Sequence, residues 1–586
     1  MRKIISIAKE HKWAIIFALF CTFIIMAPQV YFRFAHKDIY QGVEMMAASD
    51  ETAYLSRVRE VQDGHLSLAN PFLKEAKNGP YILPPLGEII VGYLGKIFFL
   101  DIRNTILLSR FIFPFLDFLL IYSFVYLLSK KKLTALVAST GVILGSILLN
   151  QRAIFQLIKG VSPRLDFLIF SRPIIPSIHI FLFFGFLTFC WLFLERKTLR
   201  WGLLAVLFLG SSFYLYFYTW SFLYVFCGML CLFFLIQKKW NDIKRMMSVM
   251  LGGIVLAIPY FFNLYSVSRN SSYAEMSQRF GFVASRDTVL GLLITPLLII
   301  FLVFFQKQWK ERFVFSLALL FTPFIVLNQQ IITGRVLINA HYHWYCHTPL
   351  AVIFLTIILF ELLAKTRKRS LEKIAAFLMI CASVYVGVFI QRASYDVREK
   401  DAVDSQRYGP VFEWLNKNAG KDQVVFANDN FSPMAAVYTP LNVFYCSPAI
   451  YYLGTTGERL QDSLFSSYRL NGLKAEETQQ VFSDQRVRIS GALYAMYYRE
   501  TTGGYEGMPE AVLEKLVQEY QGALSIPPEK YYKDLWEKYN VDYAVWDKQN
   551  EPQWQLNNFS FLEEAYQNKG LIIYRFNPNA QPKLAQ

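Results

Sequence analysis

Residues 13–34 read WAIIFALFCTFIIMAPQVYFRF, an apolar run with a single charged side chain, Arg33, close to its end. A helix needs about 20 such residues to cross the hydrocarbon core of a bilayer. The preceding residues 1–12 are basic, as at the start of a secretory signal, but no small-residue cleavage site follows them. We therefore expect residues 13–34 to be kept as a first membrane span.

The chain up to about residue 390 repeats this pattern of apolar stretches separated by short polar segments. The further stretches lie near residues 104–128, 133–150, 174–194, 201–219, 221–237, 247–265, 288–305, 312–327, 347–364 and 373–390. Together with the first, they predict an α-helical polytopic membrane bundle of about eleven transmembrane helices, several of them short.

The composition agrees with this fold class. Of the 586 residues, 54% are hydrophobic and 17% aromatic, which is too apolar for an ordinary soluble protein. The net charge of +15 does not indicate nucleic-acid binding, because Lys and Arg gather in short runs between the apolar stretches. Seven scattered cysteines are too few for a disulfide framework and indicate no redox or zinc role.

The basic runs predict how the chain crosses the membrane. With the N-terminus inside, they all fall on one side, at residues 130–132, 195–197, 237–239, 307–312 and 365–369. The positive-inside rule makes that side the cytoplasm. The apolar segment 87–100 contains Glu88 and Lys96, and we treat it as an interfacial helix, because a span there would send residues 130–132 outside. Segments 35–103, 151–173, 266–287, 328–346 and the C-terminal region then lie outside.

From about Arg392 the composition becomes that of a soluble protein, with polar residues spread throughout. We therefore expect a transmembrane domain over residues 1–391, with a large first outer loop at 35–103, and a soluble extracytoplasmic α/β domain over 392–586. The strands of this second domain are expected at 424–427, 443–446, 543–546 and 571–576, and its helices at 409–418, 509–522 and 529–540.

An acidic pair follows the first span on its outer side, in residues 49–64, SDETAYLSRVREVQDG. A helix over residues 52–63 places Tyr54 and Arg57 on the same face as Asp50. The Asp50 carboxylate can then take a proton from an acceptor hydroxyl or amine while an Arg holds a phosphate leaving group. The simpler alternative is that Asp50 caps the helix and the charges form a solvated face.

This segment also carries a family resemblance. Asp-Glu-Thr-Ala-Tyr at 50–54, followed by Arg-Glu-Val at 59–61 and Gly64, resembles the first outer-loop motif of the glycosyltransferase C (GT-C) superfamily. It looks most like the aminoarabinose transferase and protein O-mannosyltransferase branch. The resemblance is specific over these residues and consistent in layout over the multispan region.

The resemblance implies a chemistry for the acidic pair. Members of the superfamily transfer a sugar from a polyprenyl-phosphate carrier on the outer leaflet, which makes Asp50 the base and Glu51 its neighbour. Any divalent metal ion, Mg²⁺ or Mn²⁺, is expected at this pair. The arginine of the family motif corresponds to Arg59, whereas the helical wheel places Arg57 nearer to Asp50. The choice of phosphate ligand between Arg57 and Arg59 stays open.

Two arginines near the outer ends of spans are further candidates for holding a phosphate. Arg172 lies in Ser-Arg-Pro at the entrance of the fourth span, where the alternative is an arginine that snorkels to the interface. Arg110 lies near the outer end of the second span, seven residues before Asp117. Arg110 and Asp117 are expected to face the bundle interior or a water-filled cavity, because a charged side chain costs about 2.5–3.5 kcal/mol at the bilayer centre.

The loop 328–346 is the most polar outer loop of the membrane region. Arg335 and His341 are its candidates for contacts to phosphate or sugar. A zinc site at His341, His343 and His347 is an alternative, but the loop supplies no carboxylate.

Two other outer segments invite a functional interpretation. The alternating aromatic residues from Tyr214 to Trp220 suit an interfacial belt better than a sugar-stacking platform. The loop 269–286 is a candidate mobile lid.

These observations favour an inverting membrane glycosyltransferase, hexosyl or pentosyl, that is a multi-pass protein of a bacterial plasma membrane. The resemblance implies a polyprenyl-phosphate sugar donor and a glycan, lipid or protein acceptor, and we expect no nucleic acid to be involved. One alternative is a transporter or flippase of lipid-linked glycans, which would place charges throughout the spans. Another is a non-catalytic scaffold for envelope assembly.

Overall fold

The computed structural model describes residues 6, 8–305, 310–498 and 507–580, so Lys307 of the basic run 307–312 lies outside the described residues. The chain forms two compact units. Unit 1 comprises Met1–Asp38, Arg103–Phe261 and Ser285–Asp401, and unit 2 comprises Ile39–Ile102, Phe262–Ala284 and Ala402–Gln586. These units differ from the contiguous segments 1–391 and 392–586 that composition suggested, because two outer loops join the C-terminal region in unit 2.

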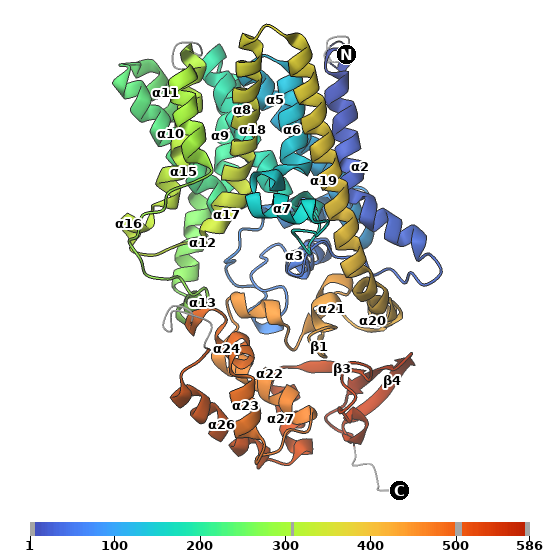
Figure 1. Cartoon of the computed structure of the whole chain (residues 1–586). Helices are drawn as coiled ribbons and strands as arrows, with labels where there is room; N and C mark the ends of the chain where they lie inside the picture. The colour runs from blue at the N-terminus through green and yellow to red at the C-terminus, as the bar shows by residue number, and fades with distance from the viewer. Residues whose placement is uncertain (1–5, 7, 306–309, 499–506, 581–586) are drawn as a thin grey trace. The chain divides into compact units, whose positions relative to one another are not determined.

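Unit 1 is a bundle of helices (Figure 1). Its helices are α2 (Lys12–Ala35), α5 (Ile102–Ser129), α6 (Lys132–Leu144), α7 (Gln151–Ile158), α8 (Ser177–Arg196), α9 (Leu199–Phe213), α10 (Phe217–Ile236), α11 (Trp240–Leu256), α12 (Ile258–Ser268), α14 (Ile294–Phe305), α15 (Lys310–Leu327), α16 (Gln330–Thr333), α17 (Asn339–Tyr342), α18 (Thr348–Lys365) and α19 (Arg369–Asp404). Helix α12 begins in unit 1 and ends in unit 2, and α19 runs unbroken across residue 392.

Every stretch expected to span the membrane is helical over most of its length, but the expected count of about eleven crossings is not confirmed. Among the described residues, 7 helical segments are long and apolar enough to cross, and 8 if α11 and α12, which meet at a bend of 50°, form one broken span. Helices α6, α9 and α14 are apolar but shorter. The 13 residues of α6 rise only about 20 Å, less than the thickness of a hydrocarbon core.

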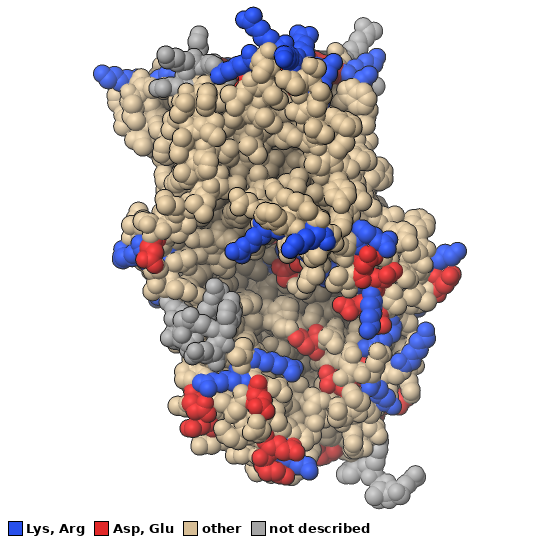
Figure 2. All heavy atoms as spheres, viewed as in Figure 1, with Lys and Arg blue, Asp and Glu red and all other residues tan. Residues whose placement is uncertain are grey.

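The basic runs at the ends of these helices lie at one end of unit 1. Lys132 Nζ is 2.8 Å from Glu10 Oε1, and Lys130 Nζ is 3.5 Å from Glu195 Oε1. Lys131 makes a similar ion pair with Glu361. Figure 2 shows Lys and Arg gathered at this end, next to a broad surface of unit 1 without charged side chains. This arrangement is typical of a multi-pass membrane protein, and the assignment of this end to the cytoplasm stays a prediction.

Close helix packing in unit 1 uses small residues. Gly185 of α8 faces the ring of Phe208 on α9, and a Cβ at Gly185 would lie 2.1 Å from Phe208 Cε1. A glycine at this point allows the two helices to approach each other, as small residues do in membrane bundles.

Unit 2 contains a mixed sheet of five strands. The strands are β1 (Val424–Phe426), β2 (Asn442–Val443), β3 (Val541–Asp547), β4 (Leu562–Asn568) and β5 (Leu571–Phe576), in the order β2-β1-β3-β5-β4. Strand β1 pairs in parallel with β2 and β3, while β5 pairs antiparallel with β3 and β4. The strands expected at 424–427, 543–546 and 571–576 are present as β1, β3 and β5, whereas β2 shares only Val443 with the strand expected at 443–446. Strand β4 was not expected, because its sequence LEEAYQN is polar and lies at the sheet edge.

The C-terminal region also contains helices, some of which were expected. The expected helices are present as α20 (Gly409–Asn418), α26 (Glu510–Leu524) and α27 (Pro528–Lys538). Among the described residues, α21 (Ser432–Tyr438), α22 (Gly457–Leu470), α23 (Thr478–Asp484) and α24 (Arg486–Tyr494) were not expected. The α/β class of the region is as expected.

The first outer loop belongs to the core of unit 2. It contains α3 (Glu51–Asp63), the 3₁₀ turn η1 (Lys74–Ala76) and α4 (Leu86–Ile97), and α3 packs against both α4 and α21. The backbone N–H of Val443 in β2 donates to the carbonyl of Phe72 at 2.8 Å. The segment 87–100 is therefore helical as expected, but one face of α4 is buried against α3: a Cβ at Gly92 would lie 2.5 Å from Val61 Cγ1. Its position at a membrane surface stays a prediction.

Candidate active site

The two neighbouring carboxylates at the start of α3 lie in different surroundings. Asp50 is the N-cap residue and is exposed, yet its side chain makes no capping hydrogen bond to the helix. Glu51 is only 1% exposed, and its Oε2 accepts a hydrogen bond from the backbone N–H of Ala47. The structure therefore does not support the helix-cap alternative for Asp50. Of the acidic pair, Asp50 is the carboxylate that faces solvent, whereas Glu51 holds the turn that leads into the helix.

Arg57 points into unit 2. It is 1% exposed, its Nη1 lies 2.6 Å from Glu88 Oε1, and its Nη2 donates to the carbonyl of Leu83 at 2.6 Å. Burial raises the pKa of Glu88, and the Arg57 guanidinium opposes this effect. Both terminal nitrogens of Arg57 thus tie α3 to α4 and the segment before it.

Arg59 and Tyr54 reach the surface of α3. Arg59 is partly exposed, and its Nε is 2.8 Å from Asp63 Oδ2 one helical turn further on. Tyr54 lies one turn after Asp50 and is also partly exposed. Between the two arginines that the sequence left as alternatives, Arg59 is the one whose side chain a soluble ligand can reach.

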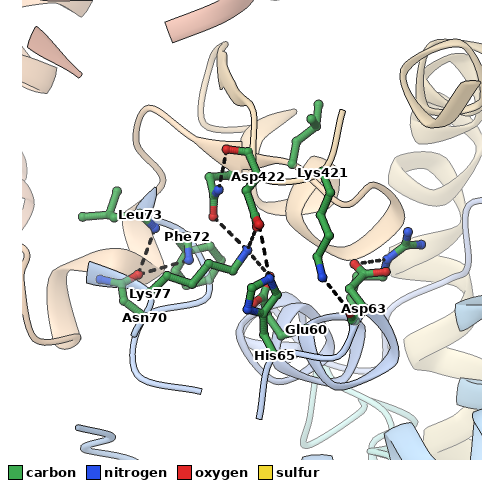
Figure 3. Close-up of polar contacts among 12 residues, drawn as sticks. Glu60, Asp63, His65, Asn70, Phe72, Leu73, Lys77, Lys421 and Asp422 are labelled. Carbon is green, nitrogen blue, oxygen red and sulfur yellow. Dashed lines mark hydrogen bonds and ion pairs between the residues drawn. The ribbon is translucent and has the colours of Figure 1, made fainter. Parts of the chain in front are cut away.

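The far end of α3 carries a charge cluster, which we call the Lys77 cluster: Glu60, His65, Lys77 and Asp422 (Figure 3). Glu60 and Lys77 are buried, whereas His65 and Asp422 are partly exposed. Lys77 Nζ is 3.0 Å from Glu60 Oε1 and also bonds to Asp422 Oδ1. His65 Nε2 is 3.3 Å from Asp422 Oδ2. Lys77 is 4% exposed, so all of its neighbours must compensate a desolvated ammonium group.

Burial and Lys77 together set the ionisation of this cluster. Burial raises the pKa of Glu60 to about 7, and the charge and hydrogen bond of Lys77 only partly oppose this. Burial also lowers the pKa of His65, and Lys77 adds to that effect. Burial would raise the pKa of Asp422, but the hydrogen bond and charge of Lys77 outweigh it and lower that pKa.

Sequence reasoning missed this cluster as a unit. Glu60 was visible as part of the Arg-Glu motif, but Lys77 and Asp422 lie 345 residues apart. A lysine in a polar loop is normally solvated, so only the tertiary structure reveals its burial.

In unit 1, the structure brings Arg110 next to the turn that contains Arg172. Arg110 is buried on α5, and its Nε donates to the carbonyl of Ser171 at 2.9 Å. Ser171 ends the 3₁₀ turn η3 (Ile169–Ser171), and Arg172, which follows directly, is partly buried. Arg110 therefore faces the bundle interior, as expected, and helps to fix the backbone from which Arg172 projects.

His341 belongs to a cluster of aromatic rings in unit 1. Its Nδ1 is 2.5 Å from the hydroxyl of Tyr216, and the two rings stack with centroids 5.8 Å apart. Tyr218 meets the His341 ring edge to face at 4.8 Å, and Trp344 lies beside it and is exposed. Tyr216 and Tyr218 therefore make defined polar and ring contacts to His341, beyond what an interfacial belt requires. Arg335, in the same outer loop, is exposed.

No group of three or more His, Cys, Asp or Glu side chains that could hold a metal ion occurs in the part of the chain that the structure describes. His343 is exposed and His347 is buried, whereas His341 stacks on Tyr216, so the zinc alternative for these three histidines gains no support.

The candidate lid at 269–286 is anchored in part within unit 2. It contains α13 (Tyr273–Arg279), whose last residue is buried and donates from Nη1 to the carbonyl of Thr455 at 2.5 Å. The carbonyl of Arg279 accepts a hydrogen bond from the N–H of Met496 at 3.0 Å. Motion of the segment as a lid stays a prediction.

No protein-family model matches the sequence, and no curated protein matches it. Among solved structures, the chain is similar to ArnT from Cupriavidus metallidurans bound to undecaprenyl phosphate, with a TM-score of 0.45 and 11% identity over 98% of this chain and 99% of that chain. It is also similar to the archaeal oligosaccharyltransferase AglB from Archaeoglobus fulgidus in complex with an inhibitory peptide and a dolichol-phosphate. That match has a TM-score of 0.46 and 11% identity over 93% of this chain and 70% of that chain. Because the identity is low, we base the functional proposal on the residues of this chain.

Proposed function

We propose that this protein is a multi-pass membrane glycosyltransferase that moves a sugar from a polyprenyl-phosphate carrier to an extracytoplasmic glycan, lipid or protein acceptor. The observation that carries the proposal is the exposed Asp50 carboxylate at the start of a well-anchored helix, in a chain whose described residues include 7 membrane-length apolar helices. The motif resemblance around residues 50–64 supplies the donor class. A transfer assay with hexose and pentose donors distinguishes a hexosyltransferase from a pentosyltransferase.

In the proposed reaction, Asp50 acts as general base. The acceptor hydroxyl or amine gives its proton to the Asp50 carboxylate while its oxygen or nitrogen forms a new bond to the anomeric carbon of the sugar. The bond between that carbon and the carrier phosphate oxygen breaks, and the phosphate leaves with the electron pair. A cationic side chain that holds the phosphate lowers the barrier by stabilising the charge of the leaving group.

Arg59 is our first candidate on α3 for a phosphate ligand, because Arg57 is engaged in a buried ion pair. Arg110, Arg172, Arg335 and His341 of unit 1 remain candidates for contacts to the phosphate or the sugar. A part for Mg²⁺ or Mn²⁺ is also a proposal, which the effect of EDTA on the same assay tests.

The test is a transfer assay with the full-length protein in detergent and a panel of radiolabelled undecaprenyl-phosphate hexoses and pentoses. We expect Asp50→Asn to reduce donor consumption by at least about 100-fold, the usual contribution of a general base. Asp38→Asn, which changes another exposed aspartate of the first outer loop, is the matched control and is expected to stay active. Donor consumption by Asp50→Asn at the wild-type rate would contradict the proposal. If Asp50→Asn loses translocation of lipid-linked glycans but keeps normal sugar transfer, the protein is a flippase instead.

A further inference from the structure

The Lys77 cluster lies at the opposite end of α3 from Asp50, and it joins segments that are distant in the sequence (Figure 3). Glu60 is on α3 and His65 follows that helix directly, Lys77 follows η1, and Asp422 precedes β1. Lys77 Nζ lies 3.0 Å from Glu60 Oε1 and 3.3 Å from Asn442 Oδ1 at the start of β2, and it also bonds to Asp422. One buried ammonium group therefore links α3 to the edge of the sheet.

The backbone conformation of Asp422 allows its carboxylate to contact both Lys77 and His65. Its backbone has a φ of +65°, in the left-handed region. Residues other than glycine rarely adopt this conformation, and among them Asp and Asn tolerate it best. Its carbonyl accepts a hydrogen bond from Asn442 Nδ2 at 3.1 Å. In this conformation one carboxylate oxygen reaches Lys77 and the other reaches His65. Such backbone geometry persists only where the surrounding contacts determine it.

A second set of contacts extends the cluster along α3 toward the surface. Lys421, next to Asp422, donates from Nζ to the carbonyl of Asp63, the last residue of α3. The Asp63 carboxylate in turn pairs with Arg59 at 2.8 Å. The turn at residues 421–422 thus holds the end of α3 through both side-chain and backbone groups, on the helix that also carries Asp50.

We propose that Lys77 is a positioning residue for the reaction: its ion pairs with Glu60 and Asp422 fix the orientation of α3 and so the direction in which α3 presents Asp50. This inference rests on the proposed function, because it assigns a role to Asp50. The ion pair between Lys77 and Glu60 depends on pH, because protonation removes the negative charge of the Glu60 carboxylate.

The groups that face Glu60 define the expected pH dependence. These are Lys77, Asp63 on the same helix and Asp422 from the sheet edge, while His65 is faced by Lys77, Asp422 and Lys421. The pKa of about 7 for Glu60 means that its ion pair with Lys77 forms as the pH rises through neutrality. Burial and the nearby Lys77 lower the pKa of His65, which shifts its protonation to lower pH.

The first test compares Lys77→Met with Lys538→Met in the transfer assay. Lys538 also pairs with two carboxylates in unit 2, those of Glu458 and Asp462, but its partners belong to α22 and not to α3. We expect Lys77→Met to lower kcat at least tenfold with little change in KM for the donor, because small misplacements of a catalytic group are costly. We expect Lys538→Met to keep the wild-type kcat. Equal kcat values for the two variants, or an effect on KM alone, would overturn the inference.

The second test uses the pH profile of kcat. Wild type is expected to lose activity as the pH falls from 8 to 6, and Glu60→Gln is expected to abolish the step near neutrality, because Gln cannot change its charge. A step of unchanged size in Glu60→Gln would overturn the assigned role of Glu60. A merely structural role for the cluster would not move the profile.

A readout without activity separates the two proposals. We expect the backbone amides of α3 to exchange with deuterium at least tenfold faster in Lys77→Met than in wild type or Lys538→Met, at one pH and in the full-length protein. Unchanged exchange would overturn the positioning role even if transfer is observed. Faster exchange together with an inactive wild type, or with a fully active Asp50→Asn, would instead reject the proposed function while leaving the hold of Lys77 on α3 established.

Discussion

Among single residues, the adjacent side chains of Asp50 and Glu51 differ in burial and in their contacts. Glu51 is buried and accepts the N–H of Ala47, whereas Asp50 is exposed and does not cap its helix. The arginines differ in the same way, because Arg57 is buried against Glu88 and Arg59 is at the surface. All four residues can be read from the sequence motif. Which of them face solvent depends on the side of α3 on which each residue lies.

Glu60 predicts a pH-dependent stability. Its pKa is about 7 in the folded chain against an ordinary value of 4.5, so its contribution to stability is fully present below pH 4.5 and is lost as the pH rises through 7. We expect wild type to lose up to about 3 kcal/mol of stability relative to Glu60→Gln between pH 4.5 and 8. Thermal unfolding of both proteins in detergent at several pH values measures this difference. The lowered pKa of His65 affects both proteins, so it cancels in the comparison. A difference that is constant with pH would contradict the assigned ionisation.

The Arg57–Glu88 pair predicts a structural rather than a ligand-binding phenotype. Arg57→Met leaves a buried carboxylate without its cation, and breaking such a pair costs about 3–5 kcal/mol. We expect faster amide exchange in α4 in this variant, and recovery when Glu88→Leu is added. Arg59→Met, which removes a surface pair, is the matched control and is expected to leave α4 exchange unchanged. A raised donor KM with normal α4 exchange in Arg57→Met would instead make Arg57 the phosphate ligand.

At the scale of elements, the sequence predicted helices and strands where a single physical signal dominates. Apolar stretches of about 20 residues gave the positions of the long helices, and β1, β3 and β5 were visible as short runs of large apolar and aromatic residues. The edge strand β4 and the amphipathic helix α22 were missed, because their polar faces hide the pattern. The bend between α11 and α12 was also not predicted; it lies at Ala257, two residues before Pro259 in the first turn of α12.

The candidate site was predictable only in part, for the same reason. The acidic pair and Glu60 could be found because they are adjacent in one motif. The Lys77 cluster depends on a contact between the first outer loop and the turn before β1, which no local pattern in the sequence announces. Whether Lys77 is buried is decided by the packing of the C-terminal region.

At the scale of the whole molecule, the chain alternates between its two units rather than filling them in order. The first outer loop and residues 262–284 leave the helical bundle to join the C-terminal region, so unit 2 is assembled from three separate segments. Insertions of this kind place α3 and its acidic pair on a folded support. A linear domain boundary drawn from composition cannot describe such an arrangement.

The proposed topology predicts which parts of the chain a membrane-impermeant reagent can reach. In a Cys381→Ser background, which removes an exposed native cysteine, Lys515→Cys is expected to react with an impermeant maleimide in intact cells. Lys238→Cys, at the basic end of unit 1, is expected to react only after the membrane is opened. The reverse pattern would invert the assigned orientation and place the acidic pair in the cytoplasm.

The central claim is that the exposed Asp50 carboxylate is the base of a sugar transfer. The most direct measurement is single-turnover release of undecaprenyl phosphate from a radiolabelled donor by full-length wild type and Asp50→Asn, with donor binding measured on the same samples. We expect Asp50→Asn to bind the donor with nearly wild-type affinity but to release the carrier phosphate at least about 100-fold more slowly. Equal release rates at equal donor occupancy would contradict it.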